Sequence, residues 1–154
     1  MAETDYFFYL SFENSLCKDY ITEKFFNPMG KHVIPIVLGG APNGPNNRSD
    51  YTDGLGAPYH SFIDARQYSS PGELAKYLNM LYSTPQLYAE YFWWKDHYNI
   101  MPYYNVGPHF RQKNYCDICR RLHEEPGTVK GNQKVIKNLR EFWEGKSRCQ
   151  RVII

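Results

Sequence analysis

Short apolar runs separated by polar turns and helical patterns occupy the first hundred residues of the chain. Residues 7–12 (FFYLSF) are apolar on both faces of a strand, which predicts a central strand covered on both sides. Residues 33–38 (VIPIVL) predict a second strand, in which Pro35 cannot donate a ladder hydrogen bond. Either this strand starts at Pro35, or the amide side of Pro35 faces an irregular edge. Residues 60–64 (HSFID) form a third, short extended piece.

Helical patterns lie between and after these strands. Residues 20–27 predict a helix that Asp19 caps and Pro28 ends. The tetrapeptide 70–73 (SPGE) is a clear helix start, and a similar signal opens a helix over residues 85–98. These patterns together predict an α/β fold. We expect the packed residues of the helices to be Ile21, Phe25, Phe26, Leu74, Leu78, Leu81, Tyr82, Leu87, Tyr88, Tyr91, Phe92, Trp93 and Trp94, the tryptophans serving as core rather than for sugar stacking.

A long loop over residues 39–59 is too rich in Gly, Pro, Asn and Asp for regular structure. It contains Asn47-Arg48-Ser49, a glycosylation sequon. The tripeptide is either a chance occurrence in an Asn-rich loop or a modification site at Asn47 in a protein of the secretory pathway.

Composition and charge narrow the class of protein. With 154 residues, 42% hydrophobic and 17% aromatic, the chain suits one folded unit and is too apolar for disorder. Residues 1–108 carry 7 Lys+Arg and 11 Asp+Glu, a net −4, whereas residues 109–154 carry 11 and 5, a net +6. The longest aliphatic run, residues 33–38, is far below the roughly 20 residues of a membrane-spanning helix. Residues 1–5 are acidic in part and resemble no signal peptide.

The junction of the first strand and first helix is a candidate phosphate site. A strand, a polar turn and a helix N-terminus form the arrangement in which α/β proteins receive nucleotides. The simplest interpretation is structural: Asp19 caps the helix, worth about 1 kcal/mol, and Glu23 interacts with its dipole. The functional interpretation is that Lys24, leaning back toward the helix start, joins the amides around a diphosphate. Glu13 or Glu23 would then bind ribose hydroxyls.

The same stretch resembles the donor-binding motif of the α-1,3-fucosyltransferases, glycosyltransferase family 10. The resemblance rests on Phe12-Glu13-Asn14-Ser15 followed by Asp19-Tyr20-Ile21-Thr22-Glu23-Lys24, without a gap. It continues through HVIPIVLGG from His32, HSFIDARQYSSPGELAKYLNML from His60 and YAEYFWWKD from Tyr88, and then fades apart from CDICRRL at Cys116.

The resemblance implies a fold, an activity and a set of site residues. It implies an incomplete Rossmann-like, GDP-fucose-binding domain over residues 1–108 of a GT-B glycosyltransferase, followed by a basic tail over residues 109–154. The expected reaction transfers L-fucose from GDP-fucose to N-acetylglucosamine with inversion, without a required metal ion. Lys24 is expected on the phosphates, with Glu23 and Tyr20 around the nucleotide and sugar. The full set of expected donor-binding residues is Glu13, Asn14, Tyr20, Thr22, Glu23 and Lys24.

The same resemblance places other functions outside these residues. The general base and the acceptor site are expected in a missing N-terminal domain, so we expect this chain alone to be inactive. The family's enzymes reside in the Golgi membrane through an N-terminal anchor. Met1 is therefore expected to be internal to a longer protein or the start of a fragment. No nucleic-acid partner is expected.

The tail contains Cys116-Asp117-Ile118-Cys119, a Cys-x-x-Cys motif. Such a motif is a disulfide, half of a zinc site or a redox pair. The resemblance favours a disulfide between Cys116 and Cys119. Cys17 and Cys149 then remain, and Cys17 is free to pair with a cysteine upstream of this chain.

Basic residues beyond the motif lie in a weak helical pattern with apolar ones. We favour a solvated face on a short helix, the alternative being contact with phosphates of a membrane or nucleic acid. For the whole chain, the alternative to the enzymatic interpretation is a non-catalytic relative or a small basic binding module. The basic residues are Lys130, Lys134, Lys137, Arg140, Lys146, Arg148 and Arg151, beside Val135, Ile136, Leu139, Phe142 and Trp143.

Overall fold

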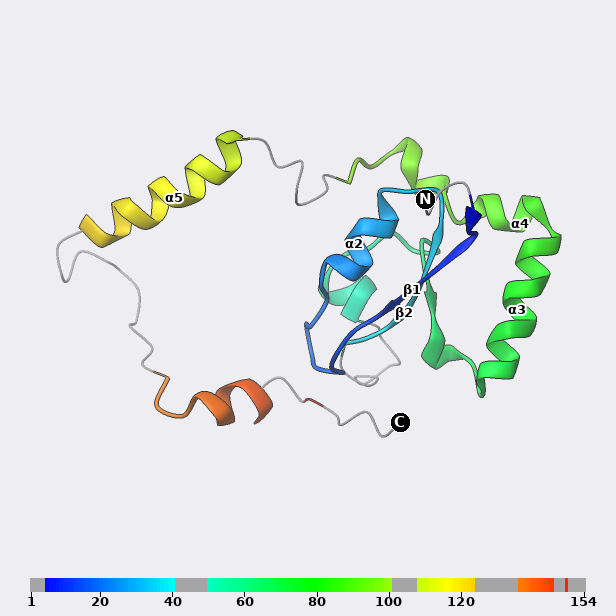
Figure 1. Ribbon diagram of the computed structural model, residues 1–154, viewed down its shortest axis with the longest axis horizontal. Helices are drawn as coiled ribbons and strands as arrows, with labels where there is room; N and C mark the ends of the chain where they lie inside the picture. The colour runs from blue at the N-terminus through cyan, green and yellow to red at the C-terminus, as the bar shows by residue number, and fades with distance from the viewer. Residues whose placement is uncertain (1–4, 41–49, 101–107, 124–135, 146–148, 150–154) are drawn as a thin grey trace.

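A computed structural model describes residues 5–40, 50–100, 108–123, 136–145 and 149 (Figure 1). The predicted sequon at Asn47 lies outside these residues. Three strands form a parallel sheet in the order β1-β2-β3: β1 (Phe8–Phe12), β2 (Ile34–Leu38) and β3 (Ile63–Asp64). The α/β class predicted from the sequence is therefore confirmed.

The predicted central position of the first strand is wrong within the described sheet. β2 is central, with β1 on one side and the two-residue β3 on the other, whereas β1 pairs with β2 alone. Its side chains Tyr9 and Leu10 are 43% and 63% exposed, so the apolar faces that suggested burial lie open in this chain. Hydrophobic residues on both faces indicate that a strand can be buried on both sides, but the pattern does not show which other elements would pack there.

Pro35 sits inside β2, opposite Tyr9 of β1. The amide of Ile34 donates to Phe7 on the β1 side, so the nitrogen of Pro35 faces the β3 side. The pairing of β3 begins only at Ile36. The proline therefore interrupts no ladder bond, as the second of the two predicted alternatives requires.

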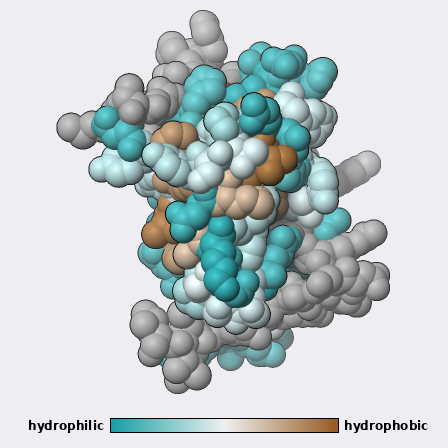
Figure 2. Space-filling view, turned by 90° about the vertical axis from the view of Figure 1, so that its right-hand side faces the viewer, coloured by the Kyte–Doolittle hydropathy of each residue, from teal (hydrophilic) through white to brown (hydrophobic). Residues whose placement is uncertain are grey.

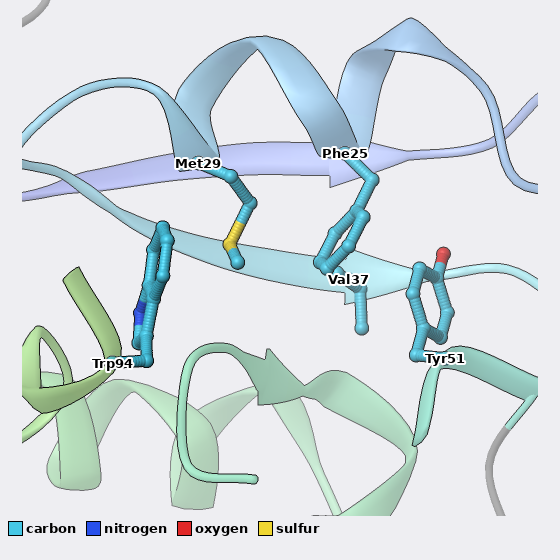
Figure 3. Packing of buried hydrophobic residues seen from close by; sticks show 5 residues of the cluster. All are labelled: Phe25, Met29, Val37, Tyr51 and Trp94. Atoms are coloured by element: carbon cyan, nitrogen blue, oxygen red, sulfur yellow. The ribbon is translucent and has the colours of Figure 1, made fainter. Parts of the chain in front are cut away.

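Helices cover both faces of the sheet. On one face, α2 (Glu23–Met29) packs against Val37 of β2 in the first core cluster, which Figure 3 shows: Phe25, Met29, Val37, Tyr51 and Trp94. On the other face, α3 (Pro71–Ser83) and α4 (Pro85–Glu90) cover the second cluster: Ile34, Ile36, Ile63, Leu81 and Tyr91. Figure 2 shows the side of the molecule with α3 and α4, where small hydrophobic patches lie between hydrophilic side chains.

The helix signals were predicted with mixed success. Ser70 caps α3 through its side chain, which accepts from the amide of Glu73, as predicted. The predicted helix over residues 85–98 is shorter, since α4 ends at Glu90 and a 3₁₀ turn follows at Trp93–Asp96. Trp94 is buried as expected, but Trp93 is 44% exposed and is not core.

The described part of the predicted long loop contains regular structure. Asp50–Gly54 form a π-helical turn, η1, and Tyr51 within it is fully buried against Phe25. The prediction that no regular structure occurs over residues 39–59 is therefore wrong at η1. One buried tyrosine supplies enough apolar contact to dock the turn on the core.

Helix α5 (Pro108–His123) runs through the Cys-x-x-Cys motif, and a second π-helical turn, η5, covers Glu141–Gly145. In the part of the chain that the structure describes, no helix is both long and apolar enough to cross a membrane. The predicted boundary between residues 108 and 109 falls at the start of α5 and stays a prediction.

Candidate functional site

The candidate site lies where β1 ends and α2 begins. Glu13 follows β1 directly, and its amide extends the ladder by donating to Leu38 at 2.9 Å. Thr22 has an extended backbone and caps α2, accepting from the amide of Lys24. The end of β1 and the start of α2 lie next to each other at the carboxyl edge of the sheet (Figure 1). This edge is where α/β proteins bind ligands.

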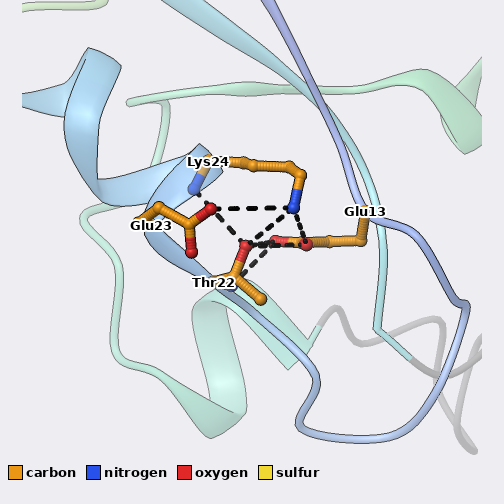
Figure 4. Close-up of polar contacts among 4 residues, drawn as sticks. All are labelled: Glu13, Thr22, Glu23 and Lys24. Carbon is orange, nitrogen blue, oxygen red and sulfur yellow. Dashed lines mark hydrogen bonds and ion pairs between the residues drawn. The ribbon is translucent and has the colours of Figure 1, made fainter.

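The Glu13 carboxylate holds this junction together. It accepts from the Thr22 amide at 2.7 Å, and the Thr22 hydroxyl lies 2.8 and 3.0 Å from its two oxygens (Figure 4). The Glu13 side chain is fully buried. A buried carboxylate requires such partners, since its desolvation is otherwise costly. Glu13 is thus a positioning group for the start of α2.

Lys24 completes the cluster and reaches back toward the start of its helix, as predicted. Its Nζ lies 3.6 Å from Glu13 Oε2 and 3.4 Å from Thr22 Oγ1. It also lies 3.7 Å from Glu23, whose side chain is 62% exposed. Glu13 and Glu23 hold the Lys24 ammonium group, and the Lys24 side chain as a whole is 31% exposed, so a ligand can reach this residue.

Asp19 is not the helix cap, which corrects the prediction. Asp19 has φ +60° in a turn, and its amide donates to Asp50 at 3.0 Å. α2 therefore begins four residues later than Asp19, after Thr22. The prediction that Pro28 ends the helix is also wrong, because Pro28 lies within α2 and is buried. The turn at Asp19 is fixed by its hydrogen bond to Asp50 of η1, a distant contact that local capping rules do not include.

Asn14 and Tyr20 flank the cluster without joining it. Asn14 is exposed, and Tyr20 is half-buried with its amide donating to Cys17 at 3.1 Å. The structure therefore brings together Glu13, Thr22, Glu23 and Lys24 of the six predicted donor-binding residues. Asn14 and Tyr20 stay at the turn between the two elements.

Tyr51 is a neighbour of the site that the sequence did not reveal. A Cβ atom added to Gly39 would lie 2.5 Å from the Tyr51 hydroxyl and 2.7 Å from Glu13 Cγ, so these three residues pack tightly. Burial, helped by the charge of Glu13, raises the pKa of Tyr51 well above its usual value, and its hydroxyl stays protonated. A tyrosine in a loop of turn-forming residues carries no sequence signal for this role.

Asp64 and Arg66 form a second charged pair, at the end of β3. The Arg66 guanidinium donates to both Asp64 oxygens, from Nε at 3.1 Å and Nη2 at 2.9 Å. Burial works against the charge of Arg66, but the hydrogen bonds to Asp64 raise its pKa above the usual value. The sequence signal for this pair is an aspartate at the end of a strand followed by an arginine two residues later, and the pair was not predicted from it.

The cysteine pairing also differs from the prediction. Cys17, which is buried, forms a disulfide with Cys149, while Cys116 and Cys119 are free and exposed on α5. The predicted Cys116–Cys119 disulfide is therefore wrong in this structure. α5 continues without a break through both residues, which leaves their thiols on a regular helix. Among the described residues, no group of three or more His, Cys, Asp or Glu could hold a metal ion.

Comparisons with known proteins match nearly the whole chain. The family described as glycosyltransferase family 10 (fucosyltransferase) C-term matches residues 1–142. Alpha-(1,3)-fucosyltransferase C of Drosophila melanogaster is 44% identical over 97% of this chain and 30% of its own length. The human 4-galactosyl-N-acetylglucosaminide 3-alpha-L-fucosyltransferase 9 is 38% identical over 82% of this chain and 32% of its own length.

The chain matches only part of the length of each relative. The glycoprotein 3-alpha-L-fucosyltransferase A of Drosophila melanogaster is 39% identical over 97% of this chain but only 26% of its own length. The chain thus spans roughly a third or less of the curated relatives it matches. Because the family match covers almost all of its residues, the chain belongs to glycosyltransferase family 10, the fucosyltransferases.

Proposed function

We propose that this chain carries part of the GDP-fucose site of an α-1,3-fucosyltransferase. The observation that carries the proposal is the cluster of Glu13, Thr22 and Lys24, which holds a partly exposed lysine side chain at the carboxyl end of β1. Membership of a fucosyltransferase family and the names of the relatives supply the reaction class.

Lys24 has the chemistry that a departing diphosphate needs. When the bond between fucose and GDP breaks, negative charge grows on the diphosphate oxygens. A cation already held in place by Glu13 stabilises that charge without reorganising during the reaction. In this proposal Lys24 supplies the positive charge and a metal ion is not required. Glu13 fixes the position of Lys24 and does not itself contact the donor.

Glu23 is better placed than Glu13 for the ribose hydroxyls. Its carboxylate is largely exposed beside Lys24, whereas the carboxylate of Glu13 is buried and already hydrogen-bonded. Asn14 and Tyr20 lie at the turn leading to α2 and are proposed to border the nucleotide and sugar. In this proposal Glu23, rather than Glu13, binds the ribose hydroxyls.

The complete reaction needs groups beyond this chain. An acceptor hydroxyl of N-acetylglucosamine attacks the anomeric carbon as GDP leaves, which inverts that carbon, and a general base takes the hydroxyl proton. We propose that the base and the glycan site belong to a further domain, in a Golgi enzyme of the GT-B arrangement whose donor domain is Rossmann-like. A membrane contact would come only through an anchor in that further part.

A calorimetric titration of the purified chain with GDP, compared with ADP, tests the proposal. We expect saturable, GDP-selective binding that Lys24→Ala abolishes. Lys18→Ala is the matched control, because Lys18 is exposed and forms a weak ion pair with the exposed Asp19, at 3.9 Å, away from the Glu13 cluster. A folded chain that binds no GDP, or a Lys24→Ala variant that binds as well as the wild type, would contradict a donor site in these residues.

A further inference from the structure

A second concave region lies at the opposite edge of the sheet from Glu13. It borders β3, and β2 separates it from β1. Its volume of about 640 Å³ is within the roughly 300–1,000 Å³ range of small-molecule sites. Six of its lining residues carry aromatic rings: Tyr59, His60, Phe62, Tyr68, Tyr77 and Tyr91.

Two contacts fix the inner wall of this pocket. The His60 ring stacks on Tyr91 with centroids 3.9 Å apart, and the Tyr91 hydroxyl lies 2.7 Å from that of Tyr77. One of these hydroxyls donates to the other. Tyr91 is only 4% exposed, so the hydroxyl pair joins a buried tyrosine to the half-buried Tyr77 at the pocket surface.

The backbone at His60 is held in an uncommon conformation. His60 has φ +57°, the left-handed region that few residues other than glycine adopt. The stack on Tyr91 holds the ring in place at that turn. Such backbone conformations persist where the surrounding structure over-determines them, and they gather at ligand-binding positions.

The polar groups of the pocket favour an uncharged ligand rich in hydroxyls. Its polar lining consists of hydroxyls, the His60 imidazole, the Gln67 amide and the Asp53 carboxylate, and none of its described lining residues is Lys or Arg. A phosphate would therefore meet a carboxylate without a lysine or arginine to balance it. Burial raises the pKa of Tyr68 to about 12, so that phenol also remains a donor at neutral pH.

Aromatic surface continues outward from the pocket. Tyr59 at the rim is 80% exposed, and its carbonyl accepts from the Trp93 indole at 2.9 Å. Trp93 is 44% exposed and lies beside His97. The electron-rich face of an aromatic ring attracts the C–H groups on the apolar face of a pyranose. The rim thus adds two partly exposed aromatic rings to the aromatic lining of the pocket.

We propose that this pocket is a saccharide-binding site for an uncharged glycan, distinct from the donor site. One sugar ring enters between His60 and Tyr77 and takes hydrogen bonds from the tyrosine hydroxyls and Gln67. The next unit stacks on Tyr59 and Trp93. This binding needs no nucleotide, and it stands whether or not the chain binds GDP.

A saturation-transfer difference NMR titration with N,N′,N″-triacetylchitotriose and with lactose tests this site. We expect saturable transfer to the sugar C–H protons from at least one of the two. Tyr59→Ala should weaken binding about tenfold by removing the exposed rim stack. Tyr77→Phe, which keeps the ring and removes only the hydroxyl, should weaken it several-fold. Tyr98→Ala is the control, because Tyr98 is 57% exposed and does not line the pocket.

The two sites are separated by Lys24→Ala, which should leave sugar binding unchanged while removing GDP binding. Each variant is first shown to unfold at the wild-type temperature, so that a loss of binding reports the pocket. Absence of saturable binding of both sugars to the folded chain would overturn the proposal. So would Tyr59→Ala and Tyr77→Phe variants that bind like the wild type, or sugar binding that depends on Lys24.

Discussion

The Glu13 carboxylate and the Lys24 ammonium group lie 3.6 Å apart, with the Thr22 hydroxyl bonded to both. The three residues tie the end of β1 to the first turn of α2. The Glu13 side chain is fully buried, whereas the Lys24 side chain is partly exposed and can be reached by a ligand. Substitution of Glu13 should therefore mainly change stability, and substitution of Lys24 should mainly change ligand binding.

Glu13→Ala should destabilise the chain by about 2–3 kcal/mol. The change removes the acceptor of the Thr22 amide and hydroxyl, and it leaves Lys24 without its buried partner. Glu23→Ala should cost less than about 1 kcal/mol, since Glu23 is exposed and contributes mainly through the helix dipole. Urea unfolding of both variants measures the difference, and equal losses would contradict a structural role specific to Glu13.

Gly39→Ala should cost about 1–3 kcal/mol by overpacking the wall behind the site. The added methyl group would lie 2.5 Å from the Tyr51 hydroxyl and 2.7 Å from Glu13 Cγ. Gly72→Ala is the matched control, because its methyl group would meet only Ser70 Oγ, at 3.6 Å, inside helix α3. There alanine should be neutral or stabilise by up to about 1 kcal/mol. Thermal unfolding in which both variants behave alike would count against the tight packing.

Alkaline pH should destabilise the chain through Tyr88. Its hydroxyl donates between the carbonyls of Phe7 and His32, and burial raises its pKa to about 12 from 10.0. The folded state therefore retains a proton that the unfolded state loses. The stabilisation is complete below pH 10 and disappears as the pH rises to about 12.

Tyr88→Phe provides the test of this pH dependence. The variant should be about 1 kcal/mol less stable at pH 8, where the hydrogen bond is lost, and its unfolding should vary less between pH 10 and 12. Tyr82→Phe serves as the control, since Tyr82 is 60% exposed. Unfolding is followed with the free thiols alkylated. A Tyr88→Phe variant as pH-sensitive as the wild type would disprove the assignment.

The disulfide between Cys17 and Cys149 should contribute about 3–5 kcal/mol, because it joins residues separated by 132 positions. Cys149→Ser should therefore lower the unfolding temperature clearly. A Cys116→Ser, Cys119→Ser double variant should leave it unchanged, since both thiols are free and exposed. Counting reactive thiols in the native oxidised chain should find two. Peptide mapping that finds Cys116 joined to Cys119 would refute this pairing.

Local patterns were sufficient for several features of the fold. β1 and β2 are short apolar runs, and Ser70 caps α3 because serine, proline and glutamate stand at the positions that a helix start requires. The return of Lys24 toward its helix start also follows from local geometry, since helical side chains lean in that direction. The family motif around residues 12–24 was readable for the same reason, because it is contiguous.

Features that depend on distant contacts were missed. Asp19 has the side chain of a cap, but its amide is bonded to Asp50, 31 residues away, and Thr22 caps the helix instead. Tyr51 lies in a stretch of turn-forming residues, yet burial against Phe25 places it beside Glu13. No local propensity contains these contacts, because they exist only after the loop has docked on the sheet.

The sequence by itself determined the α/β class, the strand-to-helix motif with Lys24, and the family to which the chain belongs. Only the tertiary structure decided which carboxylate is buried, which cysteines pair, and that aromatic residues from separate segments enclose a pocket beside β3. The physical reason is the range of the interactions. Capping and periodicity act within a few residues, whereas burial, pairing and pocket formation depend on which distant segments the core brings into contact.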